Sequence, residues 1–410
     1  MALITVLVLL FLLIINWFLY RQWVSPAIIT TTLWFFLSII YNLTDHGLYA
    51  LSDKFYLIVI LWNLGFSISC YLSGKLKIIA PQASVSLEKE NTWKFFLPLI
   101  CISLLITIYG RIQIGLAYNS SNILAGIYAH SVTSLSGGIS PIQLPFYYSI
   151  AQEFSTYSLV IIGSLMYFHD KKDYKLIFIL LLFIIFTILR SNKFSICQCL
   201  FYFITLRVLT KGISKKTLLL FGGIFIFFIV GTQVLRRSDG DSTINLINMI
   251  SVYFLSPLPA FDYVINAPIN LIEDFNGEYT FRAFIPYINL LGYNLVGNSD
   301  PFNLNFWTYT PLHVNVYTVF FSFYVDFGLP GIIGASLIYG AFFGYLWKGC
   351  SKRIPMFMVA YASMSYILFF QFFADFLISY FWANFLPLCF IYLYFTHFKL
   401  NIRKYSLAQL

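Results

Sequence analysis

Apolar runs of about 20 residues recur along this chain of 410 residues, and no other feature constrains its fold as strongly. Only 10% of the residues are charged and 60% are hydrophobic, which is far from the balance of a soluble domain. Inside hydrocarbon, backbone N–H and C=O groups have no water to bind, so a segment that crosses it satisfies them within a helix. The sequence therefore predicts an all-α polytopic membrane protein, formed by residues 1–410 as a single integral membrane domain.

The positions of these runs predict about eleven transmembrane helices, with roughly ten to twelve as the range. The first run, 2–20, has no basic stretch before it and no small-residue cleavage site, so we expect a retained helix rather than a signal peptide. The expected helices lie near 2–20, 26–43, 55–74, 94–115, 142–168, 175–189, 194–210, 217–235, 328–347, 355–376 and 380–398.

Basic residues predict the orientation of the spans, because lysine and arginine gather in short loops on the cytoplasmic side. With the loop around Lys75 inside, the N-terminus lies outside, the C-terminus lies inside, and most of the 25 basic residues face the cytoplasm. The net charge of +9 therefore reflects membrane topology, and we expect no nucleic-acid partner. Several basic residues fall on the outer side against this bias: Lys54, Arg111, Arg190, Lys193, Arg236, Arg237 and Arg282.

Residues 236–327 form the longest segment between expected helices, and they lie on the outer side. About 90 residues are too many for a structureless connection within a compact protein, so we expect this loop to fold. Its apolar part, 244–265, is interrupted by Ser256, Pro257 and Pro259. These interruptions favour a short interfacial or re-entrant helix over a further span.

The outer-side basic residues at helix ends are the strongest chemical signal in the sequence. Arg190 and Lys193 flank a tight turn after one expected helix, and Arg236 and Arg237 follow another. Arginine stays charged at any relevant pH, and its planar fork of donors matches phosphate oxygens. We therefore expect these residues, together with Arg282 of the outer loop, to bind phosphate. The alternative is that they anchor helix ends at lipid headgroups.

The sequence holds little that would bind a metal ion or a nucleotide. Its six cysteines lie in or at the ends of apolar runs, where they predict packing rather than a metal site or disulfides. Asp239-Gly-Asp241 has a chelating spacing, but we interpret it as a solvated turn beside Arg237. No glycine loop of the nucleotide-binding type occurs. We therefore expect no metal and no cofactor.

One ordered set of residues resembles the pattern of a known family. The set comprises 253–262, 277–281, Asn315, Tyr324, Asp326, Gly328, Gly331, Gly340 and Gly344. It resembles the outer loop and C-terminal signature of the Wzy-type oligosaccharide repeat-unit polymerases, which make O-antigen and capsule. The similar part covers roughly 190–347, and the Gly340-x-x-x-Gly344 spacing within it also predicts close helix packing.

The resemblance implies a fold of the GT-C type and a metal-independent glycosyltransferase activity. A glycan on undecaprenyl diphosphate would pass to the non-reducing end of another lipid-linked repeat unit, as in lipopolysaccharide biosynthesis. The protein would lie in the bacterial inner membrane with its site facing the periplasm. Its partners would be the lipid-linked oligosaccharide and membrane lipid, and a polysaccharide chain-length regulator is left open.

Roles for individual residues follow from this activity. Diphosphate or sugar would be bound by Arg190, Arg236, Arg237 and Arg282, together with Lys193. Glu278 and Tyr279 suit a sugar hydroxyl and ring face. Asn315 and Tyr324 are expected to bind substrate as parts of the resembling pattern. The acceptor hydroxyl also needs a group to take its proton, for which histidine is suited because it titrates near neutral pH. The candidates, in order of preference, are His313 and Asp326, followed by Asp262, Glu278 and Glu153.

Each of these roles has a structural alternative. His313 is equally a loop histidine without a chemical role, and Asp326 is equally a helix cap or the partner of an arginine. Glu153 and Asp375 lie within apolar runs, so both should face the interior of the helix bundle.

Two other activities stay open at this point. An O-antigen ligase would use the same donor with a lipid A core acceptor, and a flippase would move the lipid-linked oligosaccharide without chemistry. Transporters often show paired inverted repeats, whereas this chain has one large asymmetric outer loop. The sugars, their linkage and the kind of polysaccharide are not determined by the sequence.

Overall fold

The computed structural model describes the N-terminal region, several stretches of the middle of the chain, and nearly all of its last hundred residues before the tail. The described residues are 1–78, 89–123, 125–127, 129–130, 145, 147–148, 150–152, 154–155, 181, 185, 193–212, 219, 223, 254–266, 276–293, 295, 308–310, 313–314 and 316–397. They are helical apart from turns, extended links and one antiparallel pair of two-residue strands.

The chain divides into two compact units. The first comprises Met1–Ile78, Ser238–Phe357 and Met364–Phe385, and the second comprises Ile79–Arg237, Met358–Ser363 and Leu386–Leu410. Segments far apart in the sequence therefore belong to the first unit, which also holds most of the predicted site residues.

Five helices among the described residues are long and apolar enough to cross a membrane, so the chain is a multi-pass membrane protein. They are α1 (Ala2–Tyr20), α2 (Pro26–Leu43), α3 (Asp53–Ser73), the Pro98–Tyr118 part of α4 (Lys89–Tyr118), and α13 (Phe320–Ser351). Further helices on expected spans are α8 (Lys193–Lys211), α14 (Pro355–Phe369) and α15 (Phe381–His397).

Most expected helix boundaries agree closely with the described helices. The helices expected near 2–20 and 26–43 match α1 and α2, and those expected near 55–74 and 194–210 match α3 and α8 within about two residues. The spans expected near 142–168, 175–189 and 217–235 fall almost wholly outside the described residues.

The largest differences from the expectation are at the start of α13 and the end of α14, and α4 also begins about five residues before its expected start near 94. α13 begins at Phe320, ahead of the expected start near 328. A short helical stretch precedes a kink at Gly328, where φ is 63° and ψ is −147°, and the helix continues after it. α14 ends at Phe369 rather than near 376. The residues that follow it form turns because Gln371 and Asp375 bind partners outside α14.

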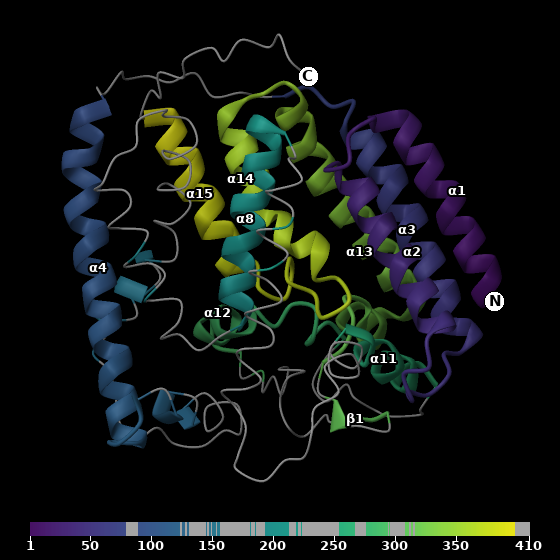
Figure 1. The fold of residues 1–410 in the computed structure, drawn as a ribbon, viewed down its shortest axis with the longest axis horizontal. Helices are drawn as coiled ribbons and strands as arrows, with labels where there is room; N and C mark the ends of the chain where they lie inside the picture. Colours follow the sequence, from purple (N-terminus) through teal and green to yellow (C-terminus); the bar gives the residue numbers. More distant parts are fainter. Residues whose placement is uncertain are drawn as a thin grey trace. The chain divides into compact units, whose positions relative to one another are not determined.

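The first unit is built on close packing of α3 against α13, and Figure 1 shows α1 and α2 beside this pair. A Cβ added at Gly340 would collide with the carbonyl oxygen of Phe66, and one at Gly344 with the carbonyl oxygen of Cys70. On the other helix, a Cβ at Gly65 would collide with the Ser336 hydroxyl. The prediction that Gly340 and Gly344 serve close helix packing is confirmed.

A buried glutamine connects the turn after α14 to three helices. Gln371 Oε1 accepts the indole N–H groups of Trp34 and Trp62, each at 3.0 Å. Its Nε2 donates to Thr30 Oγ1 at 2.9 Å, and its backbone oxygen accepts Val319 N at 2.7 Å. The Gln371 side chain is fully buried, and both ends of its amide are hydrogen-bonded. These bonds fix the turn after α14 relative to α2, α3 and the start of α13.

Within the large loop, α11 (Pro257–Asn266) is a short buried helix that packs near the start of α3. Asp262 on α11 accepts the backbone N–H of Ser52 at 3.0 Å and also bonds its hydroxyl. Ser52 in turn caps α3 by accepting Phe55 N at 3.3 Å. At 10 residues, α11 is too short to cross a bilayer, and the preceding part of 244–265 lies mostly outside the described residues.

In the second unit, the described part of α4 packs against Tyr148, Gln152 and Ser155. Ser155 Oγ donates to Ser103 Oγ at 3.2 Å, and Arg111 Nη2 donates to Gln152 Oε1 at 3.3 Å. A Cβ at Gly110 would collide with the ring of Tyr148, so this packing is also tight. Glu153 lies outside the described residues.

Candidate functional site

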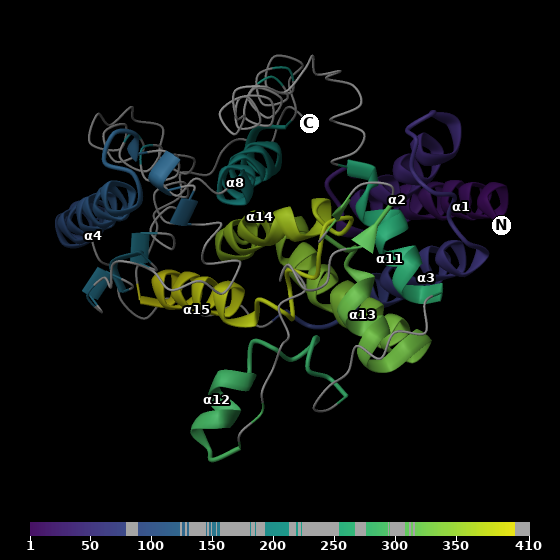
Figure 2. The ribbon, with the colours of Figure 1, turned by 90° about the horizontal axis from the view of Figure 1, so that it is seen from below.

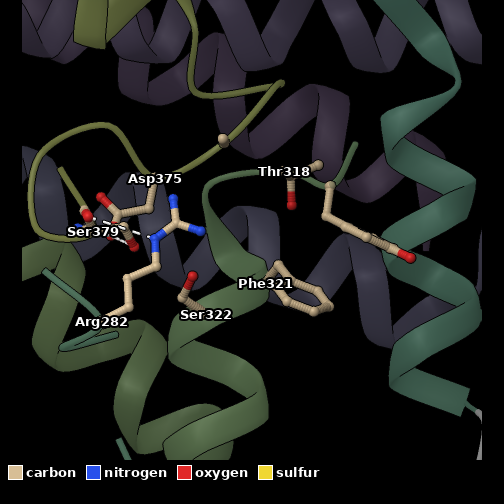
Figure 3. A pocket seen from close by; sticks show the side chains of 8 residues that line it. Arg282, Thr318, Phe321, Ser322, Asp375 and Ser379 are labelled. Carbon is tan, nitrogen blue, oxygen red and sulfur yellow. Dashed lines mark hydrogen bonds between the residues drawn. The ribbon is translucent and has the colours of Figure 1, made fainter. Parts of the chain in front are cut away.

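A pocket in the first unit contains one of the predicted site residues, Arg282. Its empty volume is about 240 Å³, open space at its mouth included. Figure 3 shows it between the turn that carries Arg282, the start of α13 and the turn after α14. The lining residues are Arg282, Tyr317, Thr318, Phe321, Ser322, Ala374, Asp375 and Ser379.

Arg282 is held at the pocket by contacts on two sides of its side chain. Its Nε donates to the Ser379 carbonyl oxygen at 3.5 Å, and its guanidinium lies 4.6 Å from the centre of the Tyr380 ring. A guanidinium stacked on an aromatic face stays charged and keeps its plane fixed. The pocket therefore contains a positioned permanent cation.

Asp375 is the acid of the pocket, and it is 3% exposed. Its Oδ1 accepts Leu377 N at 3.0 Å, Ile378 N at 3.1 Å and the Tyr339 hydroxyl. Its Oδ2 accepts the backbone N–H and hydroxyl of Ser379. A carboxylate with five donors shapes the turn around it, and the prediction that Asp375 faces the interior is confirmed.

Asp326 lies on α13 and binds the backbone of the turn at Tyr279 and Thr280, which directly precedes Arg282. It accepts Thr280 N at 2.7 Å and Tyr279 N at 3.4 Å, and the Thr280 hydroxyl donates to the Ser322 carbonyl at 3.3 Å. Within the described part of the chain, Asp326 has no ion pair with an arginine. Its position supports the alternative role as a structural anchor, because its oxygens face backbone N–H groups.

Glu278 and Tyr279 are almost completely buried beside this anchor, each at 1% exposure. The Tyr279 ring meets Phe321 edge-on at 5.5 Å, and its backbone oxygen accepts the Ser379 hydroxyl at 3.4 Å. In this conformation the Tyr279 ring packs in the protein interior, so stacking on a sugar would require the turn to move.

Tyr317 contributes an aromatic wall and a hydroxyl to the pocket. It stacks on Phe321 with the ring centres 4.4 Å apart. Burial raises the pKa of Tyr317 to about 12, partly offset by a hydrogen bond with Thr308. The hydroxyl is therefore protonated at neutral pH and can donate to an oxygen atom.

The remaining predicted residues lie elsewhere or outside the described part. His313 is in β2 (His313–Val314), where its backbone pairs with Tyr309 of β1 (Thr308–Tyr309). Tyr324 contacts Phe261 on α11 with the ring centres 5.8 Å apart. Lys193 is the first residue of α8 in the second unit. Outside the described residues lie Arg190, Arg236, Arg237 and Asn315.

The pocket also contains residues for which the sequence predicts no role in a binding site. Thr318, Ser322 and Ser379 line it with hydroxyl groups, and Asp375 supports it. Burying an aspartate within the apolar run 371–380 costs free energy unless hydrogen-bond partners surround it. For this reason the sequence predicted that Asp375 faces the interior. The hydroxyl residues carried no comparable signal because serine and threonine are common in membrane helices.

The arrangement is suited to an anionic or hydroxyl-rich ligand. Arg282 and the hydroxyl groups of Tyr317, Thr318 and Ser322 can donate hydrogen bonds to phosphate or sugar oxygens. Among the described residues, no group of three or more histidine, cysteine, aspartate and glutamate side chains could hold a metal ion.

Comparison with known proteins supports the family resemblance. Over 198 residues the chain is 25% identical to a curated O-antigen polymerase of Shigella dysenteriae, and the matched part is 46% of this chain and 47% of that protein. The chain therefore spans about half the length of this relative. No family model matches the sequence, and no solved structure matches it. The chain is thus a multi-pass membrane protein similar to an O-antigen polymerase.

Proposed function

We propose that this protein is a polysaccharide polymerase of the bacterial inner membrane. It transfers a glycan from undecaprenyl diphosphate to the non-reducing end of another lipid-linked repeat unit. The observation that carries the proposal is Arg282, a positioned cation beside three hydroxyl residues at the N-terminal end of a candidate membrane span. Similarity to a curated O-antigen polymerase supports the reaction class.

The proposed orientation places this pocket on the periplasmic side. α13 runs from the pocket residues Phe321 and Ser322 to Lys348, and Lys352 and Arg353 follow its end. Basic residues favour the cytoplasmic side, so the opposite end of α13 faces the periplasm. With the expected eleven spans and a GT-C type of fold, the large loop 236–327 would cover the outer ends of the helices.

In the proposed reaction, Arg282 binds the diphosphate as it leaves. The bond between the donor sugar's anomeric carbon and the diphosphate oxygen breaks, and the acceptor hydroxyl oxygen forms a bond to that carbon. The hydroxyl proton passes to a base, and the diphosphate leaves with the electron pair. A fixed guanidinium stabilises the charge that develops on the leaving oxygen without needing a metal ion.

We propose His313 as the base, because histidine is the residue type whose ordinary pKa lies closest to neutral pH. Asp326 is the second candidate and would otherwise position the turn that precedes Arg282. Further phosphate contacts are proposed for Arg190, Lys193, Arg236 and Arg237, and substrate contacts for Glu278, Tyr279, Asn315 and Tyr324.

The test is the lipopolysaccharide banding pattern of a deletion strain complemented with wild type, Arg282→Ala or Arg282→Lys. Wild type should restore a ladder, and Arg282→Ala should leave a band of core plus one repeat unit, with a rate loss of about 10²–10³-fold. Lysine keeps the charge without the planar fork, so Arg282→Lys should restore only part of the ladder.

Other patterns would overturn the assignment. Unattached polymer in the deletion strain would indicate a ligase, and loss of even the single unit would indicate a flippase. A normal ladder with Arg282→Ala, at a protein level equal to wild type, would remove Arg282 from the site.

A further inference from the structure

The turns directly after Arg282 in the sequence expose several large apolar side chains. We define the α12 segment as residues 281–293, which include α12 (Ile285–Leu290). Leu290 is 82% exposed and Leu291 is 78% exposed, and the neighbouring Tyr287 and Tyr293 are at least half exposed. Figure 2 shows this segment projecting to one side of α13. Large apolar side chains gathered in one exposed segment indicate a surface that contacts something other than water.

The sequence of this segment excludes the usual features of a water-facing loop. No charged residue occurs from Ala283 to Ser299, a stretch that covers most of the segment and the residues directly after it. The surrounding loop is nevertheless expected to lie outside the membrane core. The segment is rich in tyrosine and leucine and contains a few asparagines, and this composition is typical of a segment at a membrane interface.

Contacts with α13 place one end of the segment at the boundary of a span. The Phe281 ring lies 6.2 Å from the ring of Phe327, which directly precedes the kink at Gly328. From Gly328 to Ser351 the helix is roughly 35 Å long, close to the thickness of a hydrocarbon core. Lys348 is near the other end of this stretch, and basic residues favour the cytoplasmic side, so the proposed orientation puts Phe327 at the outer boundary.

Contacts with α15 place the middle of the segment at a second boundary. The Phe284 ring lies 4.9 Å from Phe381, the first residue of α15, and Tyr287 lies 4.8 Å from Trp382. The Trp382 indole N–H donates to the Ala283 carbonyl at 2.9 Å. Tryptophan and tyrosine at the start of an apolar helix are typical of the interface belt.

We propose that the α12 segment lies in the outer-leaflet interface of the bilayer, with Leu290 and Leu291 inserted among the lipids. Its occupant is the lipid surface, because the segment is continuous with two helix ends at that boundary. Arg282 then lies at the depth of the lipid phosphates, where the diphosphate of a lipid-linked sugar also lies. This last consequence rests on the proposed function, whereas the insertion itself does not.

The test measures the surroundings of a fluorophore on the full-length protein. A Leu290→Cys variant, made in a chain whose six native cysteines are replaced by serine or alanine, is labelled and reconstituted into phosphatidylethanolamine and phosphatidylglycerol vesicles. Lipids brominated in the acyl chain should reduce its emission by about half, since interfacial helices bury their apolar face in this region. Aqueous iodide should have little effect.

The matched control is Asp45→Cys, an exposed position in the turn between α2 and α3. Iodide should quench this label, and the brominated lipid should not. A label at Leu291→Cys repeats the measurement in case the first variant does not fold.

Two results would overturn the proposal. If iodide quenches position 290 as strongly as position 45, the segment lies in water. If neither quencher reaches position 290, a second copy of the chain or another part of the protein covers it. Neither measurement requires activity, so failure of the insertion and failure of the polymerase assignment are distinguishable.

Discussion

Asp375 and Ser379 are joined by two hydrogen bonds to one carboxylate oxygen, from the Ser379 hydroxyl at 2.8 Å and its backbone N–H at 2.9 Å. The Ser379 carbonyl accepts Nε of Arg282 at 3.5 Å. The acid and the arginine of the pocket are therefore linked through the backbone of a serine, as Figure 3 shows. A change at Asp375 should therefore affect the position of Arg282 through this serine.

Asp375→Asn should weaken both stability and polymerisation. The amide NH₂ cannot accept the backbone N–H groups that one carboxylate oxygen now accepts, so buried donors lose their partner. We expect the free energy of unfolding to fall by about 2–3 kcal/mol and the polysaccharide ladder to shorten. Thermal unfolding in detergent and the banding pattern measure the two effects. Asp45→Asn, in an exposed turn, should change neither; an Asp375→Asn variant with wild-type values would contradict the assignment.

Gln371→Leu should destabilise the first unit strongly. Leucine has a similar size but leaves the indole N–H groups of Trp34 and Trp62 without an acceptor in a fully buried position. We expect a loss of about 2–4 kcal/mol, measured by thermal or denaturant unfolding. If the variant unfolds at the wild-type temperature, the network contributes no stability.

Gly340→Ala and Gly334→Ala should have opposite effects on stability. A methyl group at Gly340 collides with the backbone of α3, whereas the space around Gly334 is open. We expect a loss of about 1–3 kcal/mol at Gly340. At Gly334 we expect a gain of up to about 1 kcal/mol, because alanine reduces the backbone entropy lost on folding. Unfolding of the two variants under one set of conditions compares them; equal effects would show that α3 and α13 are not in close contact.

Asp326→Asn separates an anchoring role from a catalytic one. Asparagine keeps one oxygen that can accept Thr280 N, so an anchor should survive with a loss of polymerisation of less than about tenfold and an unchanged pH profile. Loss of a general base would reduce the rate by about 10²–10⁴-fold and remove one limb of the pH profile. In vitro polymerisation across pH 5 to 9, with about half-unit steps, decides between them.

Tyr317→Phe should change stability at alkaline pH. The folded pKa is raised to about 12 from an ordinary value of 10.0, so the unfolded chain loses this proton first as pH rises. The free energy of unfolding of wild type should then fall between about pH 10 and pH 12, by up to about 2–3 kcal/mol from this group alone. The phenylalanine variant should fall less over the same window and match the wild-type slope below it. Equal slopes for both chains above pH 10 would contradict this linkage.

The sequence by itself determined the class of the protein and the bounds of several helices. The helices near 2–20 and 26–43 follow from the length of apolar runs, because a span must satisfy its own backbone groups and must match the thickness of hydrocarbon. Both requirements are local, so each run can be interpreted without the rest of the chain. The tight packing at Gly340 and Gly344 was predictable for the same reason, since the four-residue spacing alone puts two glycines on one helix face.

The tertiary structure decided which polar residues meet. Asp326 binds the backbone of Thr280, and Gln371 binds Trp34 and Trp62, although hundreds of residues separate the last set along the chain. These contacts also end α14 at Phe369, against the helical pattern of the sequence that follows. A helix pattern reports which face is apolar, but not which distant partner satisfies a buried polar group. That choice depends on the tertiary fold: Asp326 on α13 binds the turn before Arg282, and Tyr339 on the same helix binds Asp375. These contacts bring Arg282, Ser379 and Asp375 to one pocket.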